Sequence, residues 1–178
     1  MEIFIFRNSN KKINSTKSMR LIIELLLILI LGILFYQDIK ERKVSVWVLI
    51  LGLGLGGFLN YQAQQPIVFL SNSLVNIIFI ILIFLVLWLY AKLKMKKNIF
   101  EVFGKGDLLF FILLAVSLPI LSFLMVFIFS IFFSFLVFSL LKHRFKDTTV
   151  PLAGLQSLFL ALVLMVNKIV PSINIYAL

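Results

Sequence analysis

Long apolar runs, separated by short polar segments, dominate the chain. A helix needs roughly 20 apolar residues to cross the hydrocarbon core of a bilayer. On this measure the pattern predicts six membrane-spanning helices, at about residues 19–36, 44–59, 74–93, 108–118, 120–141 and 150–170. The runs lack the alternation of apolar and polar positions that is typical of transmembrane β-strands. The expected fold is therefore an all-α bundle in a membrane.

Two of the six predicted spans are short. The second span is rich in glycine, and the fourth and fifth come from one apolar stretch, residues 108–141. That stretch is too long for one helix and tight for two. We divide it at Ser117-Leu118-Pro119, because proline disfavours the continuation of a helix. The fourth span is then expected to be short.

Composition supports a membrane protein, because 62% of the residues are hydrophobic, compared with roughly 45–50% in soluble domains. A chain of 178 residues is expected to form one domain. We predict a polar, disordered N-terminal tail at residues 1–18 and a six-span membrane domain at residues 19–178. Cysteine is absent, which excludes disulfides and cysteine-ligated metal or haem sites.

The formal net charge of +10 is distributed in short clusters between the apolar runs, so no nucleic-acid partner is expected. Lys and Arg concentrate at residues 37–43, 92–106 and 142–146, whereas residues 60–73 and the turn at Pro119 carry none. Short cytoplasmic loops are enriched in Lys and Arg. The pattern predicts a multi-pass protein of the inner (cytoplasmic) membrane, with the three basic connections in the cytoplasm and both termini outside.

The N-terminal segment opposes this orientation, because it would place several basic residues outside. These are Arg7, Lys11, Lys12, Lys17 and Arg20. Met19 directly precedes the first span and is an alternative start of translation. A start at Met19 would remove most of these charges, so both starts, Met1 and Met19, stay open.

Small and polar residues within the spans have structural explanations. Gly52 and Gly56 form a GxxxG spacing, which favours close packing of helices. Asn76 and Asn167 need partners within the bilayer, and hydrogen bonds between helices are the simplest expectation. The middle of each span is otherwise almost wholly apolar, which argues against a channel or transporter.

The chain has only seven acidic residues. Glu24 follows Arg20 by one helical turn, a spacing that suits a local ion pair. Most of the other acids lie in the tail or in basic connections, where solvated charges are the simplest interpretation. Asp38 ends the first span and Asp107 begins the fourth. Because the chain crosses the membrane twice between them, both are expected at the cytoplasmic face.

Two carboxylates at one membrane face can form a catalytic pair. Close carboxylates at a low-dielectric boundary share one proton, so one can deprotonate a water while the other polarises a carbonyl group. Gly104 and Gly106 would let the backbone approach a bound peptide closely and adopt conformations that a Cβ atom forbids. Two structural alternatives stay open: Asp107 could simply cap the fourth helix, and Asp38 could be one charge of a juxtamembrane cluster.

Two segments resemble the type IV prepilin peptidases, which are GxGD aspartyl proteases with a six-span core. DIKERKVSVWVL, from Asp38, resembles their first aspartate motif, and FGKGDLLF, around Asp107, resembles their Gly-x-Gly-Asp motif. VPLAGLQSLFLAL, residues 150–162, is similar to the proline-containing start of their last core helix. The resemblance covers most of the chain from Met19 onward, and it implies Asp38 and Asp107 as the catalytic pair.

This chain departs from the motifs at three positions. Ser45 and Val46 stand where the family usually has Pro-Asn, and Leu109 stands where a lysine often follows the second aspartate. The absence of cysteine and the short length are similar to small members that lack the N-methylation domain. His143, in a basic connection, is expected to be a solvated charge rather than a metal ligand.

The resemblance implies a membrane aspartyl endopeptidase that needs no metal or organic cofactor. Its partners would be the lipid bilayer and a prepilin-like membrane protein with a short basic leader, a glycine before the cut and an apolar helix after it. The alternative is a non-catalytic membrane assembly factor or degenerate relative, in which Ser45, Val46 and Leu109 mark lost substrate handling. The oligomeric state stays open.

Overall fold

The computed structural model describes residues 2–96, 104–141, 150–170 and 174–176, with the backbone alone at residues 2–16 and at Met95. Over these ranges the chain is helical and contains no strand. The α-helices are α1 (Glu2–Glu41), α2 (Val46–Ala63), α3 (Pro66–Tyr90), α5 (Lys105–Ser117), α6 (Ile120–Leu141) and α7 (Leu152–Ile169). A π-helical turn, η1 (Ala91–Met95), extends α3. The predicted all-α bundle of six helices is confirmed.

Five helices are long and apolar enough to cross a membrane, which indicates a multi-pass membrane protein. The exception is α5, which has 13 residues. At 1.5 Å per residue it is about 20 Å long, shorter than the roughly 30 Å of the hydrocarbon core. The prediction that the fourth helix is short and ends before Pro119 is confirmed.

The first and third helices begin earlier than the apolar pattern predicts. α3 begins at Pro66 rather than near residue 74, so the predicted connection at residues 60–73 is almost entirely helical. Proline is favourable at the first position of a helix, and the polar residues that follow it lie within the first turns of α3. Where a disordered tail was expected, α1 begins at Glu2. Extending an existing helix is much less costly than nucleating a new one.

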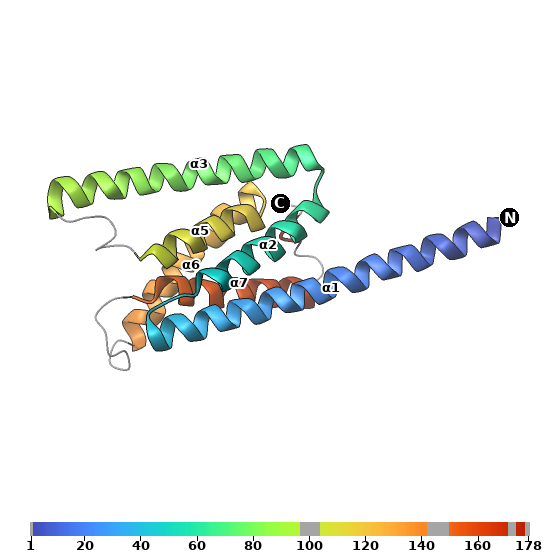
Figure 1. The fold of residues 1–178 in the computed structure, drawn as a ribbon, viewed down its shortest axis with the longest axis horizontal. Coiled ribbons are helices and arrows are strands. Elements are labelled where there is room, and N and C mark those ends of the chain that lie inside the picture. Colours follow the sequence, from blue (N-terminus) through green and yellow to red (C-terminus); the bar gives the residue numbers. More distant parts are fainter. Residues whose placement is uncertain (1, 97–103, 142–149, 171–173, 177–178) are drawn as a thin grey trace.

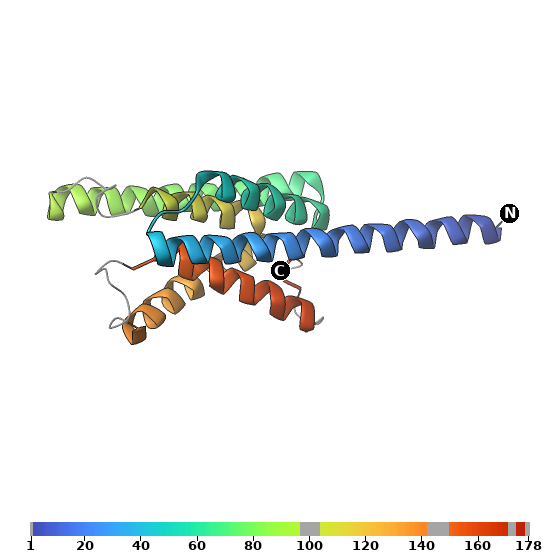
Figure 2. The ribbon, with the colours of Figure 1, turned by 60° about the horizontal axis from the view of Figure 1, so that its bottom comes forward.

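The helices alternate in direction, as Figures 1 and 2 show. The last residues of α1, α3 and α6 and the first residues of α2, α5 and α7 lie toward one end of the bundle. Asp38 lies in the last turn of α1 and Asp107 in the first turn of α5, so we name this the carboxylate end. The expectation that the two acids lie at the same end is met.

Exposed aromatic side chains lie at the carboxylate end, and lysines lie over three of them. The aromatic residues are Tyr36, Trp47, Trp88 and Tyr90, and the pairs are Lys40 with Tyr36, Lys92 with Trp88, and Lys94 with Tyr90. Trp, Tyr and snorkelling lysines are enriched where a membrane meets water. This end of the bundle therefore has the side chains of a membrane–water interface.

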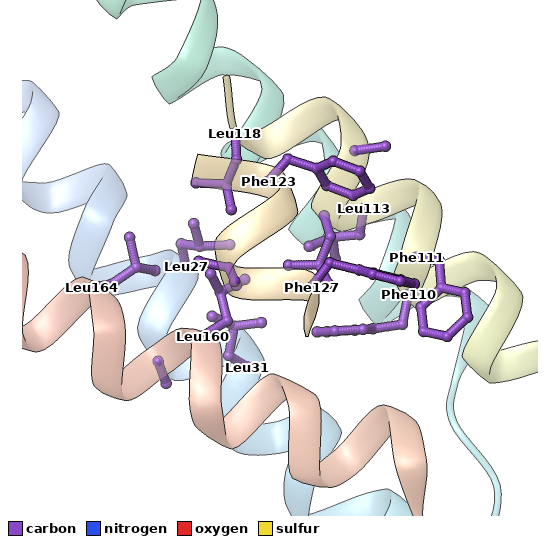
Figure 3. Close-up of a cluster of buried hydrophobic side chains, with 14 of the residues drawn as sticks. Leu27, Leu31, Phe110, Phe111, Leu113, Leu118, Phe123, Phe127, Leu160 and Leu164 are labelled. Carbon is purple, nitrogen blue, oxygen red and sulfur yellow. The ribbon is translucent and has the colours of Figure 1, made fainter. Parts of the chain in front are cut away.

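The short helix α5 lies at the centre of the bundle and packs against α2, α3, α6 and α7. Phe110, Leu113 and Leu114 are fully buried. Figure 3 shows this helix contributing to the apolar cluster that also includes Leu31 of α1 and Leu160 of α7. The core thus surrounds α5 and holds it in place although it is too short to span the membrane.

Glycines allow α2 to approach α5 closely. A Cβ atom at Gly52 would lie 2.9 Å from Leu113 Cδ1, and one at Gly56 would overlap the Ser117 side chain. Such spacing leaves no room for a larger residue, because real Cβ atoms do not approach other atoms so closely. The predicted role of this glycine pair in helix packing is confirmed.

The end of α5 lies inside the bundle, where its last carbonyl groups have no partner within the helix. Asn60 of α2 donates from Nδ2 to Val116 O at 2.9 Å. Asn76 of α3 donates from Nδ2 to Ala115 O at 2.9 Å and to Leu118 O at 3.0 Å. These bonds replace the water that a membrane interior lacks. The interhelical partner predicted for Asn76 is confirmed.

Other predicted polar contacts have mixed outcomes. Arg20 and Glu24 form the expected ion pair, with Nε and Oε1 3.3 Å apart. For Asn167 the described residues show a different contact: its Oδ1 accepts a hydrogen bond from the Ile175 amide, 3.0 Å away, in the segment after α7. His143 lies outside the described residues.

Candidate active site

Asp38 is a buried carboxylate, with 7% of its surface exposed. Its Oδ2 accepts a hydrogen bond from the Gly154 amide of α7 at 2.6 Å. The chain turns sharply after it: Arg42 has a left-handed backbone, with φ of 54°, and the Arg42 amide donates to Asp38 O at 3.1 Å. The charge of Arg42 also acts on the Asp38 carboxylate. Asp38 is therefore held within the bundle and is not one solvated charge of a juxtamembrane cluster.

Asp107 is the third residue of α5, and its carboxylate lies against the backbone of Gly104, the N-cap residue of that helix. Gly104 itself has no side chain with which to cap the helix. Asp107 Oδ1 also accepts a hydrogen bond from the Ala153 amide of α7 at 2.9 Å. Asp107 therefore supports the start of α5 and also contacts a second helix, which a simple cap would not do.

The first turn of α7 joins the two carboxylates. Pro151 is the N-cap residue of this helix and has no side-chain group that could bind the free amides of the first turn. Two of these amides instead bind the acids from α1 and α5. A helix N-terminus carries a partial positive charge that stabilises anions. Consecutive peptide nitrogens are three bonds apart, so the two bonded carboxylate oxygens lie within about 9 Å of each other. At such a separation the charge on Asp38 acts on Asp107.

Gly154 is required by the close approach of α7 to Asp38. A Cβ atom at this position would lie 2.8 Å from Asp38 Cβ and 2.9 Å from Asp38 Oδ2. Only glycine brings its amide this near to the carboxylate without a clash. Sequence reasoning noted the proline-containing start of this helix but assigned no site residue to it; a glycine shortly after the proline was the signal available.

Gly104 and Gly106 contribute space rather than unusual backbone angles. No glycine in the described ranges has a positive φ. A Cβ atom at Gly104 would lie 3.0 Å from Asp107 Oδ2, and one at Gly106 would lie 3.4 Å from Val44. Gly104 thus leaves room for the Asp107 carboxylate, and Gly106 lets α5 pack against the link between α1 and α2.

The two carboxylates of this site can take part in acid–base chemistry. Within the parts of the chain that the structure describes, no group of three or more His, Asp and Glu side chains could hold a metal ion. The two carboxylates meet amide donors, which carry no lone pair for a metal. The arrangement can bind, orient and exchange protons.

Together, the fold and the site define a multi-pass helical membrane protein in which a buried and a half-buried carboxylate bind the same helix turn near one end of the bundle. A model of the type IV leader peptidase family matches residues 25–140. This segment is more than half of the chain and includes both Asp38 and Asp107, and the protein belongs to this family. No curated protein and no solved structure matches the chain. Membership of this family indicates a membrane peptidase that acts on a protein substrate.

Proposed function

We propose that this protein is an aspartyl endopeptidase that removes the basic leader of type IV prepilin-like proteins at the cytoplasmic face of the inner membrane. Asp38 and Asp107 would together activate the water that cleaves the peptide bond. One observation carries the proposal: a buried carboxylate, Asp38, and a half-buried one, Asp107, come from different helices and bind adjacent amides of a third helix.

In the proposed reaction, one carboxylate accepts a proton from water as the water oxygen attacks the scissile carbonyl carbon. The other carboxyl group is protonated and donates a hydrogen bond to the carbonyl oxygen. The C–N bond then breaks, and the leaving amine takes up a proton from the pair. Two close carboxylates favour this starting state, because they do not both ionise easily in a low-dielectric site.

The α7 amides would orient the pair. They bind Oδ2 of Asp38 and Oδ1 of Asp107, which fixes the position of both carboxylates relative to α7. Holding reacting groups in a fixed geometry removes much of the entropic cost of the reaction. The carboxylate end also has the aromatic and basic side chains of a membrane interface, where a leader and the apolar helix after it would meet.

The alternative is a non-catalytic assembly factor or degenerate relative. It rests on the departures at Ser45, Val46 and Leu109. Ser45 precedes α2 and its amide donates to Gln37 Oε1 at 3.1 Å, Val46 is exposed, and Leu109 packs against the apolar core. The hydrogen bonds of the two aspartates involve none of these residues, which supports catalysis over the alternative.

The test is leader removal from a prepilin-like protein encoded in the same genome, co-expressed with the wild type and with Asp38→Asn and Asp107→Asn. The wild type is expected to remove the leader. Each variant is expected to lose at least about 100-fold in rate, because the carboxamide of the introduced asparagine cannot accept a proton from water. Glu24→Gln is the matched control, since Glu24 lies on α1 far from the carboxylate end. Cleavage that persists in both aspartate variants would exclude the proposed pair.

A further inference from the structure

Gln156 is a fully buried polar side chain of α7 that the proposed chemistry does not use. It lies two residues after Gly154 and none of its surface is exposed. Neither its Nε2 nor its Oε1 has a hydrogen-bond partner in the described parts of the protein. An apolar side chain of similar size would avoid this desolvation cost, so packing alone does not account for a glutamine at this position.

The register of α1 and α7 places Gln156 at nearly the same depth in the bundle as Asp38. The two helices run in opposite directions and pack side by side (Figures 1 and 2). Gly154 meets Asp38, and further along α7 Leu160 belongs to the same core cluster as Leu31 of α1 (Figure 3). Gln156 lies between these two points, about 3 Å along the axis of α7 from Gly154.

The direction of helical side chains brings the Gln156 carboxamide still closer to the site. Each Cα–Cβ bond in a helix leans toward the N-terminus, so a side chain covers the turn before its own Cα. For Gln156 that turn contains Ala153, whose amide binds Asp107. The side chain therefore leans toward the end of α7 that binds both carboxylates.

A carboxamide offers two N–H donors and a carbonyl acceptor. The main chain of an extended peptide offers the complementary pair, an N–H and a C=O group, whereas an apolar helix offers neither. We infer that Gln156 binds the main chain of the substrate next to the scissile bond, with Nε2 donating to a carbonyl oxygen and Oε1 accepting from an amide. This role rests on the proposed peptidase function and adds a substrate-binding residue to it.

Contacts with the main chain form in the ground state and persist in the transition state, so their loss raises KM and leaves kcat unchanged. The test compares the purified wild type with Gln156→Met, which keeps the length of the side chain and removes its hydrogen-bonding groups. With a prepilin-like substrate, KM is expected to rise about tenfold and kcat to change less than about twofold. Thermal unfolding is expected to show no loss of stability, because an unpartnered polar group is removed.

Ser73→Ala is the matched control. Ser73 of α3 also has a buried side-chain oxygen without a partner in the described residues, but it lies near the start of α3, away from the carboxylate end. Its KM and kcat are expected to match those of the wild type.

Binding is also measured without cleavage, by the Kd of the same substrate for Asp38→Asn alone and combined with Gln156→Met. The second variant is expected to bind about tenfold more weakly. Unchanged KM and Kd, or a fall in kcat alone, would overturn the role of Gln156 and leave the peptidase proposal standing. Weaker binding without cleavage by the wild type would support Gln156 and remove the peptidase proposal. A wild type that neither binds nor cleaves the substrate would overturn both.

Discussion

Replacing Gly154 by alanine tests whether the contact between α7 and Asp38 is needed. The added Cβ would lie 2.8 Å from Asp38 Cβ and 3.3 Å from Asp38 Cγ. Ordinary contacts between carbon atoms are about 3.5–4.0 Å. The first of these atoms is fixed to the backbone of α1 and cannot turn aside, so α1 and α7 must separate by roughly 0.5–1 Å.

The separation affects both stability and catalysis. Overpacking of this kind costs about 1–3 kcal/mol, and the higher helix propensity of alanine offsets at most about 1 kcal/mol. We expect the free energy of unfolding to fall by about 1–2 kcal/mol. A misplacement near 1 Å in a catalytic site costs on the order of 100-fold in rate, so we expect leader removal to slow by 10- to 100-fold.

The assay measures initial rates of leader removal and unfolding in detergent for Gly154→Ala, beside Gly32→Ala and Gly54→Ala. A Cβ atom at Gly32 or Gly54 would meet nothing within 4 Å. These two controls are expected to cleave at the wild-type rate and to be equally or slightly more stable. Wild-type rate and stability in Gly154→Ala would refute the reasoning that Asp38 must touch the backbone of α7.

Two further substitutions test other parts of the bundle. Asn76→Leu leaves two buried carbonyl groups at the end of α5 without these donors, so we expect the protein to lose about 1–3 kcal/mol of stability, measured by unfolding in detergent; wild-type stability would contradict this. Gly104→Ala brings a Cβ atom within 3.0 Å of Asp107 Oδ2, whereas at Gly106→Ala the nearest atoms, of Val44, are 3.4 Å away. We therefore expect several-fold slower leader removal for Gly104→Ala and a smaller effect for Gly106→Ala, and the reverse order would show that the space around Asp107 is not limiting.

The sequence alone determined the number of helices and their order along the chain. The lengths of the apolar runs and the proline at position 119 predicted six helices with a short fourth one, because hydropathy and the geometry of proline act locally. Counting crossings then placed Asp38 and Asp107 at one end of the bundle. The start of α3 was missed because polar residues in the first turns of a helix look like those of a loop.

Only the tertiary structure decided what the two carboxylates touch. Their hydrogen bonds to Ala153 and Gly154 depend on the register of α7 against α1 and α5, which no local pattern in the sequence encodes. The same holds for Gln156, because a glutamine within an apolar helix is compatible with a surface, an interface or a core. Contacts between helices that are distant in sequence depend on how whole surfaces fit together. Whether a position requires glycine can be judged only when the side chain packed against it is known.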